Sequence, residues 1–273
     1  LQVPNTGQFA VHGFFILSGL LMTTIMHRSY GYSRKGFQSY AWNRILRLYP
    51  IYFMTLALTV VVLLVVGEEA STRFHQSIYL PDSPELILYN LFMIYPDLYP
   101  IDFNPVLVPQ TWALTVEIFF YVLIGLGLSR SRKLTTAWFF ISILITLLNF
   151  SIHVSFDEFD YFNVYYFLPT ASLPFSIGAM IYHYQDKIPE WELDQKSVWI
   201  LVGFFCVYVI NAVGGRALVV YLDQVLIGYG SFLLNLAIHA VMIPLLFKMK
   251  SEKKHRKIDT EIGHYSYPFY LLH

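Results

Sequence analysis

The sequence predicts an all-α protein that crosses a membrane several times, and three observations support this prediction. Hydrophobic residues make up 56% of the chain and charged residues only 13%, whereas soluble domains carry about 25% charged residues. Apolar stretches recur at the length of about 20 residues that a transmembrane helix needs. The loops between these stretches alternate between basic and non-basic. We therefore expect residues 1–273 to form a single domain, a polytopic transmembrane helix bundle.

Seven complete spans and the start of an eighth are expected from the apolar stretches. The complete spans are residues 9–27, 49–67, 109–128, 134–152, 164–184, 197–213 and 222–247. The eighth begins near residue 263 and is cut off at His273. Because the sequence starts abruptly and stops inside an apolar stretch, we interpret it as a fragment truncated at both ends.

The charges between the spans predict which side of the membrane each loop occupies, because cytoplasmic loops collect Lys and Arg. The connections after the first, third and seventh spans are basic, as in SRSRK (129–133) and KMKSEKKHRK (248–257). Other connections are acidic or nearly neutral, namely GEEA (67–70), SFDEFDYF (155–162) and GGRALVVYLD (214–223). The loop 185–196 is mixed. This alternation predicts that the N-terminus of the chain lies outside.

Residues 68–108 do not fit the pattern of spans and loops. The stretch LILYNLFMIYP (86–96) is apolar but is only about half the length that a span requires. Tyr-rich segments favour the interface between membrane and water. We therefore expect 68–108 to be one external excursion, with 86–96 lying in the interface or dipping partway into the membrane.

Glu117 is an acid within the apolar stretch PQTWALTVEIFFYVL (109–123). On a helix its face also carries polar and small residues, which predicts that the face points into the bundle: Gln110, Ala113, Leu114, Tyr121 and Gly125. Glu117 would lie roughly 12 Å into the span at about 1.5 Å per residue. An acid near a span centre costs about 2.5–3.5 kcal/mol on insertion scales. Glu117 is therefore either a structural link between helices or a proton acceptor or relay.

Several further residues in the spans invite interpretation. His12, near the outer end of the first span, fits an interfacial hydrogen-bonding residue or a catalytic one. Ser18 and Gly19 form an SG pair that favours close helix packing. His239 is expected to be a core residue bonded to a neighbouring helix. The single cysteine, Cys206, excludes a disulfide within this chain and is expected to pack inertly.

Arg44 and Arg47 stand three residues apart at the cytoplasmic end of the second span. They fit two interpretations that spacing alone does not separate. Arginines at this level anchor a helix by extending their charged ends to the interface. Paired guanidinium groups also bind phosphates. The run KKHRK (253–257) favours a topological role or contact with lipid headgroups.

Five stretches, in order along nearly the whole chain, resemble the acyltransferase-3 family of integral membrane O-acyltransferases. They are VHGFFILSGLLM (11–22), NRILRLYPIYF (43–53), QTWALTVEIFFYVL (110–123), LPFSIGAMIYHY (173–184) and IGHYSYPFYLLH (262–273). The resemblance implies transfer of an acyl group, commonly acetyl, from a cytoplasmic acyl-CoA such as acetyl-CoA. The implied acceptor is a hydroxyl of an envelope carbohydrate or glycolipid.

The resemblance also implies roles for individual residues. Arg44 and Arg47 correspond to the family's arginine pair and would bind the phosphates of CoA, and Glu117 matches the acid of its W-x-L-x-x-E element. We expect Glu117 and His12 to be catalytic, and the bundle-facing support for the acceptor to be Ser18, Trp112, Tyr121, Tyr267 and His273. The family also carries a histidine in a helix that precedes FF-x-L-SG. His12 is too close to FFILSG to be that histidine, so we expect it outside the fragment.

These inferences lead to an O-acyltransferase of the bacterial inner membrane that uses acyl-CoA as a co-substrate, with no bound cofactor. Its partners would be the lipid bilayer, acyl-CoA and a carbohydrate or glycolipid, and not nucleic acid. No carboxylate or histidine cluster has the spacing of metal ligands, so no metal is expected. A secondary transporter or flippase for an anionic or glycolipid substrate is the alternative. A structural membrane subunit is a third possibility.

Overall fold

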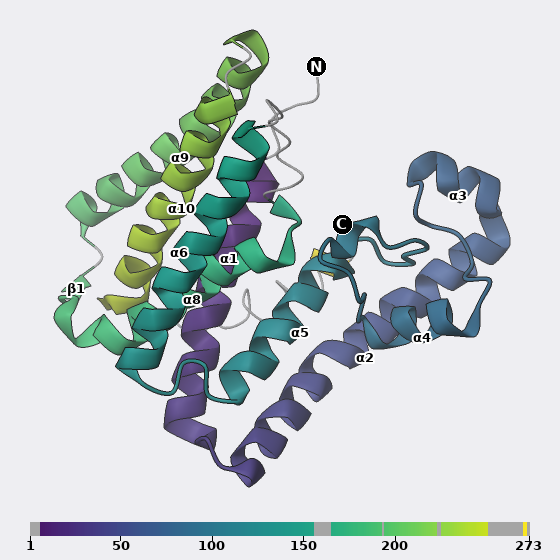
Figure 1. The fold of residues 1–273 in the computed structure, drawn as a ribbon, viewed down its shortest axis with the longest axis horizontal. Coiled ribbons are helices and arrows are strands. Elements are labelled where there is room, and N and C mark those ends of the chain that lie inside the picture. The colour runs from purple at the N-terminus through teal and green to yellow at the C-terminus, as the bar shows by residue number, and fades with distance from the viewer. Residues whose placement is uncertain (1–5, 156–164, 193, 223–224, 251–269, 272–273) are drawn as a thin grey trace. The chain divides into compact units, whose positions relative to one another are not determined.

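The computed structural model describes residues 6–155, 165–192, 194–222, 225–250 and 270–271. The chain forms two compact units. Unit 1 comprises Leu1–Tyr32 and Leu123–Ser251, and unit 2 comprises Ser33–Val122 and Glu252–His273. Helices dominate the described part of both units (Figure 1), as the sequence predicts.

Within the residues that the structure describes, five helices are long and apolar enough to cross a membrane: Phe9–Tyr30, Arg34–Val66, Arg132–Ile152, Gln195–Gly215 and Leu226–Lys248. They overlap five of the expected spans and confirm an all-α membrane protein. The helix within 109–128 covers only Thr111–Gly125, and the one within 164–184 covers only Ser172–Tyr184. The count of seven complete spans therefore stays a prediction.

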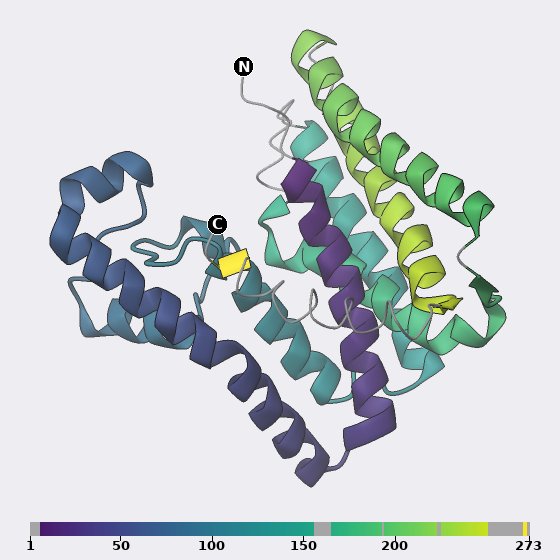
Figure 2. The ribbon, with the colours of Figure 1, turned by 180° about the vertical axis from the view of Figure 1, so that it is seen from behind.

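Unit 1 is built around the first helix, α1 (Thr6–Ile25), which continues as a π-helical turn, η1 (Met26–Tyr30). The other long helices of this unit are α6 (Arg132–Ser155), α9 (Gln195–Leu222) and α10 (Val225–Lys248). Between α6 and α9 lie a short 3-10 turn, η3 (Leu168–Ala171), and α8 (Ser172–Tyr184). α1 contacts α8, α10 and α9, and Figure 2 shows it in front of the other helices of the unit.

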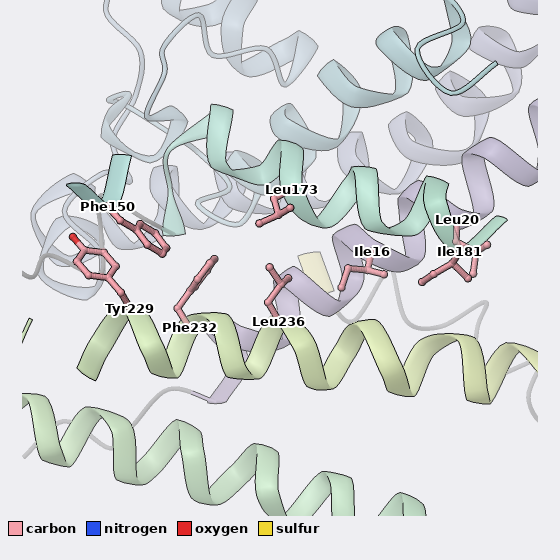
Figure 3. Packing of buried hydrophobic residues seen from close by; sticks show 8 residues of the cluster. All are labelled: Ile16, Leu20, Phe150, Leu173, Ile181, Tyr229, Phe232 and Leu236. Atoms are coloured by element: carbon pink, nitrogen blue, oxygen red, sulfur yellow. The ribbon is translucent and has the colours of Figure 1, made fainter. Parts of the chain in front are cut away.

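The core of unit 1 lies where α1, α6, α8 and α10 meet. Its side chains point toward one another in Figure 3, and they are Ile16, Leu20, Phe150, Leu173, Ile181, Tyr229, Phe232 and Leu236. Each of these side chains is at most 8% exposed. Burial of a large apolar side chain contributes about 1.5–3 kcal/mol in water, but lipid is itself apolar. The close fit of the side chains, rather than exclusion of water, therefore holds these helices together.

A polar contact fastens one end of unit 1. Ser129, in the turn between α5 (Thr111–Gly125) and α6, is fully buried. Its hydroxyl accepts a hydrogen bond of 3.0 Å from Thr23, and its backbone carbonyl accepts from Nε2 of His27 at 3.1 Å and of His183 at 3.0 Å. These bonds join the ends of α1 and α8 to this turn. Gly127, with a φ of 110°, gives the turn a backbone conformation that favours glycine.

The two last helices of unit 1 are joined by reciprocal bonds. The amide of Asn211 on α9 donates to the carbonyl of Ser231 on α10 at 2.8 Å, and the Ser231 hydroxyl donates to the Asn211 carbonyl at 3.2 Å. Near the end of α10, two short parallel strands pair, β1 (Trp191–Glu192) and β2 (Met249–Lys250). This strand pair is a small departure from the purely helical prediction. Cys206 on α9 is exposed rather than packed, so that expectation is wrong.

The longest helix of unit 2, α2 (Arg34–Val66), starts well before the predicted start of the span at residue 49. The Ser33 hydroxyl accepts a hydrogen bond of 3.1 Å from the Gly36 N–H and caps the first turn. Pro50 lies inside the helix, where it removes one backbone hydrogen bond without ending the helix. The arginines at 44 and 47 are therefore on a continuous helix and not in a loop before it.

The remainder of unit 2 consists of α3 (Glu68–Phe74), α4 (Pro84–Phe92), a 3-10 turn η2 (Pro100–Asp102) and α5. Asn90 of α4 is 1% exposed and fastens the following loop. Its amide donates to the Pro105 carbonyl at 2.9 Å, and its Oδ1 accepts from the Leu107 N–H at 2.9 Å. Tyr49 of α2 donates to the Phe92 carbonyl at 2.6 Å. The excursion at 68–108 is thus folded onto α2, and its position relative to a membrane stays a prediction.

Candidate functional site

Glu117 lies on the buried face of α5. Its side chain is 2% exposed, and Ala113, Leu114 and Tyr121 on the same face are at most 8% exposed. Phe119, on another face of the helix, is 44% exposed. The predicted face of α5 is therefore buried, and so are Val116 and Phe120 on other faces of the helix.

A hydrogen-bonded connection leads from Glu117 to α2 within unit 2. The Tyr121 hydroxyl, one turn after Glu117, donates to Oε1 of the Glu117 carboxylate. The Tyr40 hydroxyl on α2 donates to the backbone carbonyl of Tyr121 at 3.3 Å. Tyr40 is 1% exposed. The two tyrosines thereby fix the position of the last turns of α5 against the first turns of α2.

Arg44 extends this connection. Its guanidinium carbon lies 5.9 Å from the centre of the Tyr40 ring, a distance that suits a cation–π contact. Its Nε is buried and has no hydrogen-bond partner among the residues that the structure describes. A buried guanidinium N–H without an acceptor is costly, so this atom is suited to an added anionic group. Arg47, one turn later, is exposed.

Three of the predicted site residues are thus linked in unit 2 through a residue that was not predicted. The order is Arg44, Tyr40, Tyr121 and Glu117. The chain of contacts joins a cation with an unmet donor to a buried carboxylate that already accepts one bond. Such an arrangement can hold an anionic substrate group near Arg44 and keep a proton-accepting oxygen in a fixed orientation. Trp112, predicted as a support, is 6% exposed near the start of α5.

His12 and Ser18 belong to α1 of unit 1 and are both buried, at 3% and 4% exposure. The His12 ring makes edge contacts with Tyr165 and Phe232, with ring centres 5.3 and 4.9 Å apart. His12 is therefore enclosed by aromatic rings and is not a superficial interfacial group.

The SG pair of α1 serves close packing. A Cβ placed on Gly19 would overlap the backbone carbonyl of Phe175 on α8. Tyr267 and His273, the remaining predicted supports, and the KKHRK run lie outside the described residues.

His239 is a partly buried residue, but its bond differs from the prediction. Its Nδ1 donates to the Asn235 carbonyl of its own helix at 2.8 Å, instead of to a neighbouring helix. The ring lies against Tyr208 of α9, with ring centres 5.1 Å apart. In the described part of the chain, no group of three His, Cys, Asp or Glu side chains could hold a metal ion.

Comparison with known families decides what kind of protein carries these features. The family model described as Acyltransferase domain matches residues 1–273, the whole length of the chain. The chain belongs to the acyltransferase-3 family. Among curated proteins and among solved structures, nothing matches the chain. Family membership and the apolar helices together make this acyltransferase-3 member an integral membrane protein and, in general terms, a membrane O-acyltransferase.

Tyr40 is the residue of this acyltransferase-3 member that sequence reasoning missed. It lies in the segment FQSYAWNR, one turn before Arg44. The spacing of four residues places both on one helix face, which is a usable signal. Tyrosines are common near the ends of membrane helices, and the chain contains 21 of them. This spacing alone therefore does not distinguish Tyr40 from the other tyrosines.

Proposed function

We propose that the protein transfers an acetyl group from cytoplasmic acetyl-CoA, or a related acyl group from its CoA ester, to a hydroxyl of an envelope carbohydrate or glycolipid. The proposed location is the bacterial inner membrane, with the N-terminus of this chain outside. The observation that carries the proposal is the connection from Arg44 through Tyr40 and Tyr121 to Glu117. This connection joins Arg44, which is suited to bind the acyl donor, with Glu117, which is suited to accept a proton from the acceptor hydroxyl.

Arg44 is the proposed contact for the donor. Its buried Nε lacks an acceptor among the described residues, and a phosphate oxygen of CoA supplies one. Bonds between a guanidinium group and phosphate are charge-assisted and about twice as strong as neutral ones. Arg47 is exposed one turn along α2 and is free to add a second contact to the same phosphate chain. The basic loops support placing this donor on the cytoplasmic side.

Glu117 is the proposed proton acceptor. The acceptor hydroxyl attacks the thioester carbonyl, so that a new C–O bond forms as the C–S bond breaks. The hydroxyl proton passes to the carboxylate, and the CoA thiolate takes up a proton on leaving. The bond from Tyr121 orients the carboxylate. A positioned proton acceptor contributes about 10²–10⁴-fold to such a reaction.

His12 is a second proposed catalytic group, because its enclosed imidazole is able to accept and return a proton. Holding the donor and the acceptor together in the protein further lowers the activation barrier of the transfer. Effective concentrations in well-oriented pairs correspond to about 7–11 kcal/mol of the barrier.

Transfer of labelled acetyl groups tests the proposal. Membrane vesicles that contain the full-length protein are supplied with acetyl-CoA labelled in the acetyl group, and the carbohydrate and glycolipid fractions are then separated. We expect label in a fraction from which mild alkali releases acetate, as an O-ester requires. Movement of glycolipid across the vesicle membrane without any acylation would instead identify a transporter and reject the proposal.

A further inference from the structure

Asn235 is a buried polar residue of α10 that the proposed reaction does not use. It is 1% exposed and lies near the middle of the candidate span Leu226–Lys248. Ser231, one turn earlier, faces α9, because it exchanges two hydrogen bonds with Asn211 of that helix. Residues four apart share a helix face, so Asn235 is directed toward the contact between α10 and α9.

The same turns of α10 also face α1. Phe232 meets the ring of His12 on α1, with ring centres 4.9 Å apart. His239, one turn after Asn235, lies so close to α1 that a Cβ on Gly13 would be 2.8 Å from its Nε2. Because Asn235 stands between Phe232 and His239 along α10, it lies where α1, α9 and α10 of unit 1 meet.

Both polar atoms of the Asn235 amide are without a hydrogen-bond partner in the described part of the protein. A buried amide in this state costs several kcal/mol in an apolar medium, and a membrane core offers no bulk water to meet it. Leucine has nearly the same size and would avoid this cost. An amide at this position therefore indicates a group that pairs with it.

The chemistry of the junction defines that group. The Asn235 side chain offers donors on Nδ2 and an acceptor on Oδ1. His239 adds another acceptor, because its Nδ1–H is used by the Asn235 carbonyl and its Nε2 therefore carries a lone pair. A partner must both donate and accept, and it must be small, since the amide is almost fully enclosed. A hydroxyl meets both conditions.

We propose that Asn235 and His239 form a binding site for one neutral hydroxyl group at the junction of α1, α9 and α10. The hydroxyl belongs either to an internal water molecule or to the acceptor substrate. Only the second source rests on the proposed acyl transfer. In both cases the amide is retained because a hydroxyl satisfies it.

The variant Asn235→Leu tests the site through the unfolding temperature of the purified full-length protein in detergent. If a hydroxyl occupies the site, Leu deprives it of its partner, and the unfolding temperature stays the same or falls. If the amide is truly unpaired, Leu removes a buried unmet group and the unfolding temperature rises. A clear rise overturns the proposal. Asn211→Leu is the matched control, because that amide is bonded to Ser231 and its loss lowers the unfolding temperature in both cases.

A second measurement decides the matter if Asn235→Leu does not fold. In an experimental structure of the wild-type protein solved with its acceptor bound, we expect density for an oxygen within hydrogen-bonding distance of Nδ2 or Oδ1. An amide surrounded by carbon atoms only would overturn the proposal.

Kinetics separate the two sources of the hydroxyl. If the acceptor supplies it, Asn235→Leu raises the KM for the acceptor about tenfold, the effect of one lost hydrogen bond, with little change in kcat. If water supplies it, the KM is unchanged while the stability result stands. Failure of acyl transfer in the wild-type protein would reject the proposed function but leave the stability and density measurements to decide this site.

Discussion

Gly19 of α1 and Gly178 of α8 bring the backbones of their helices into contact. A Cβ placed on Gly178 would lie 3.0 Å from the carbonyl carbon of Gly19 and would overlap the carbonyl oxygen of Ile16. A Cβ on Gly19 would in turn overlap the carbonyl oxygen of Phe175. Small residues at such a crossing allow the close packing that associates helices in lipid.

We expect Gly178→Ala to destabilise the protein by at least the usual cost of overpacking, about 1–3 kcal/mol, because backbone atoms cannot move aside as a flexible side chain can. The measurement is the unfolding temperature in detergent. Gly203→Ala on α9 is the control, since its Cβ would meet nothing within 4 Å. Alanine there should be neutral or stabilising by about 0.5–1 kcal/mol. Equal effects of the two substitutions on the unfolding temperature would contradict the close backbone contact between α1 and α8.

Tyr40→Phe should lower the rate of acyl transfer about tenfold without unfolding the protein. Phenylalanine keeps the ring beneath Arg44 but removes the hydroxyl that holds Tyr121, and small displacements at a reacting centre are costly. Because this is a positioning effect, kcat should fall while the KM for acyl-CoA changes little.

Tyr49→Phe is the matched control for that substitution. Tyr49 is also on α2 and also donates to a backbone carbonyl, that of Phe92, but it is not connected to Glu117 by the bonds described above. Its loss should affect stability to a similar extent and leave kcat unchanged. If both variants lose activity equally, Tyr40 is structural only.

The features that the sequence predicted depend on local periodicity. The burial of Glu117 and Tyr121 followed from their helical spacing, and five candidate spans in the described part of the chain followed from length and hydropathy. The bounds were less accurate, because the cap at Ser33 begins α2 earlier than the apolar run alone indicates.

The features that the sequence missed depend on which turns of different helices meet. Tyr40 joins Arg44 to Tyr121 only because the first turns of α2 lie against the last turns of α5. Asn235 stands out only because the neighbouring turns of α10 engage α1 and α9. The local sequence patterns of α2 and α10 do not indicate which helices pack against them. The spacing of residues within one segment therefore could not identify these contacts.

Arg44→Ala should raise the KM for acyl-CoA by about 10–100-fold, which corresponds to the loss of a charged hydrogen bond of about 1.5–3 kcal/mol. Arg44→Lys keeps the charge but not the planar guanidinium, so it should restore only part of the binding. The exposed Arg47 should contribute less, and Arg47→Ala should have a smaller effect than Arg44→Ala.

Arg132→Ala is the control for charge alone, since Arg132 is the first residue of α6, next to the basic turn of unit 1, and is largely exposed. Its KM for acyl-CoA should equal that of the wild-type protein. If Arg44→Ala and Arg132→Ala behave alike, the arginines of α2 act only as topological anchors.

The hydrogen-bonded carboxylate of Asp194, at the start of α9, predicts that the stability of the protein depends on pH. Its Oδ1 accepts a hydrogen bond of 2.7 Å from the Ser197 N–H, and hydrogen bonds from Ser197 lower the pKa of its carboxyl. Since an unfolded Asp has a pKa of about 3.9, this contribution to stability is present above that pH and is lost as the pH falls through the lower folded pKa. Asp194→Asn retains the cap but cannot be protonated in this range. The difference in unfolding temperature between the wild-type protein and Asp194→Asn should therefore change below about pH 4 and stay constant above it. A difference that stays constant at every pH would contradict a stabilising role for the ionised Asp194 carboxylate.

Glu117→Gln tests the proposed proton acceptor directly. Glutamine keeps the size of the side chain and an oxygen that accepts from Tyr121, but it cannot take up the proton of the acceptor hydroxyl. We expect kcat to fall by about 10²–10⁴-fold, with unchanged folded yield and an unchanged KM for acyl-CoA. Tyr121→Phe, which removes the hydroxyl that donates to the carboxylate, should lower kcat by about tenfold, because the carboxylate then loses a bond that orients it. Wild-type turnover in Glu117→Gln would show that the buried acid only links helices.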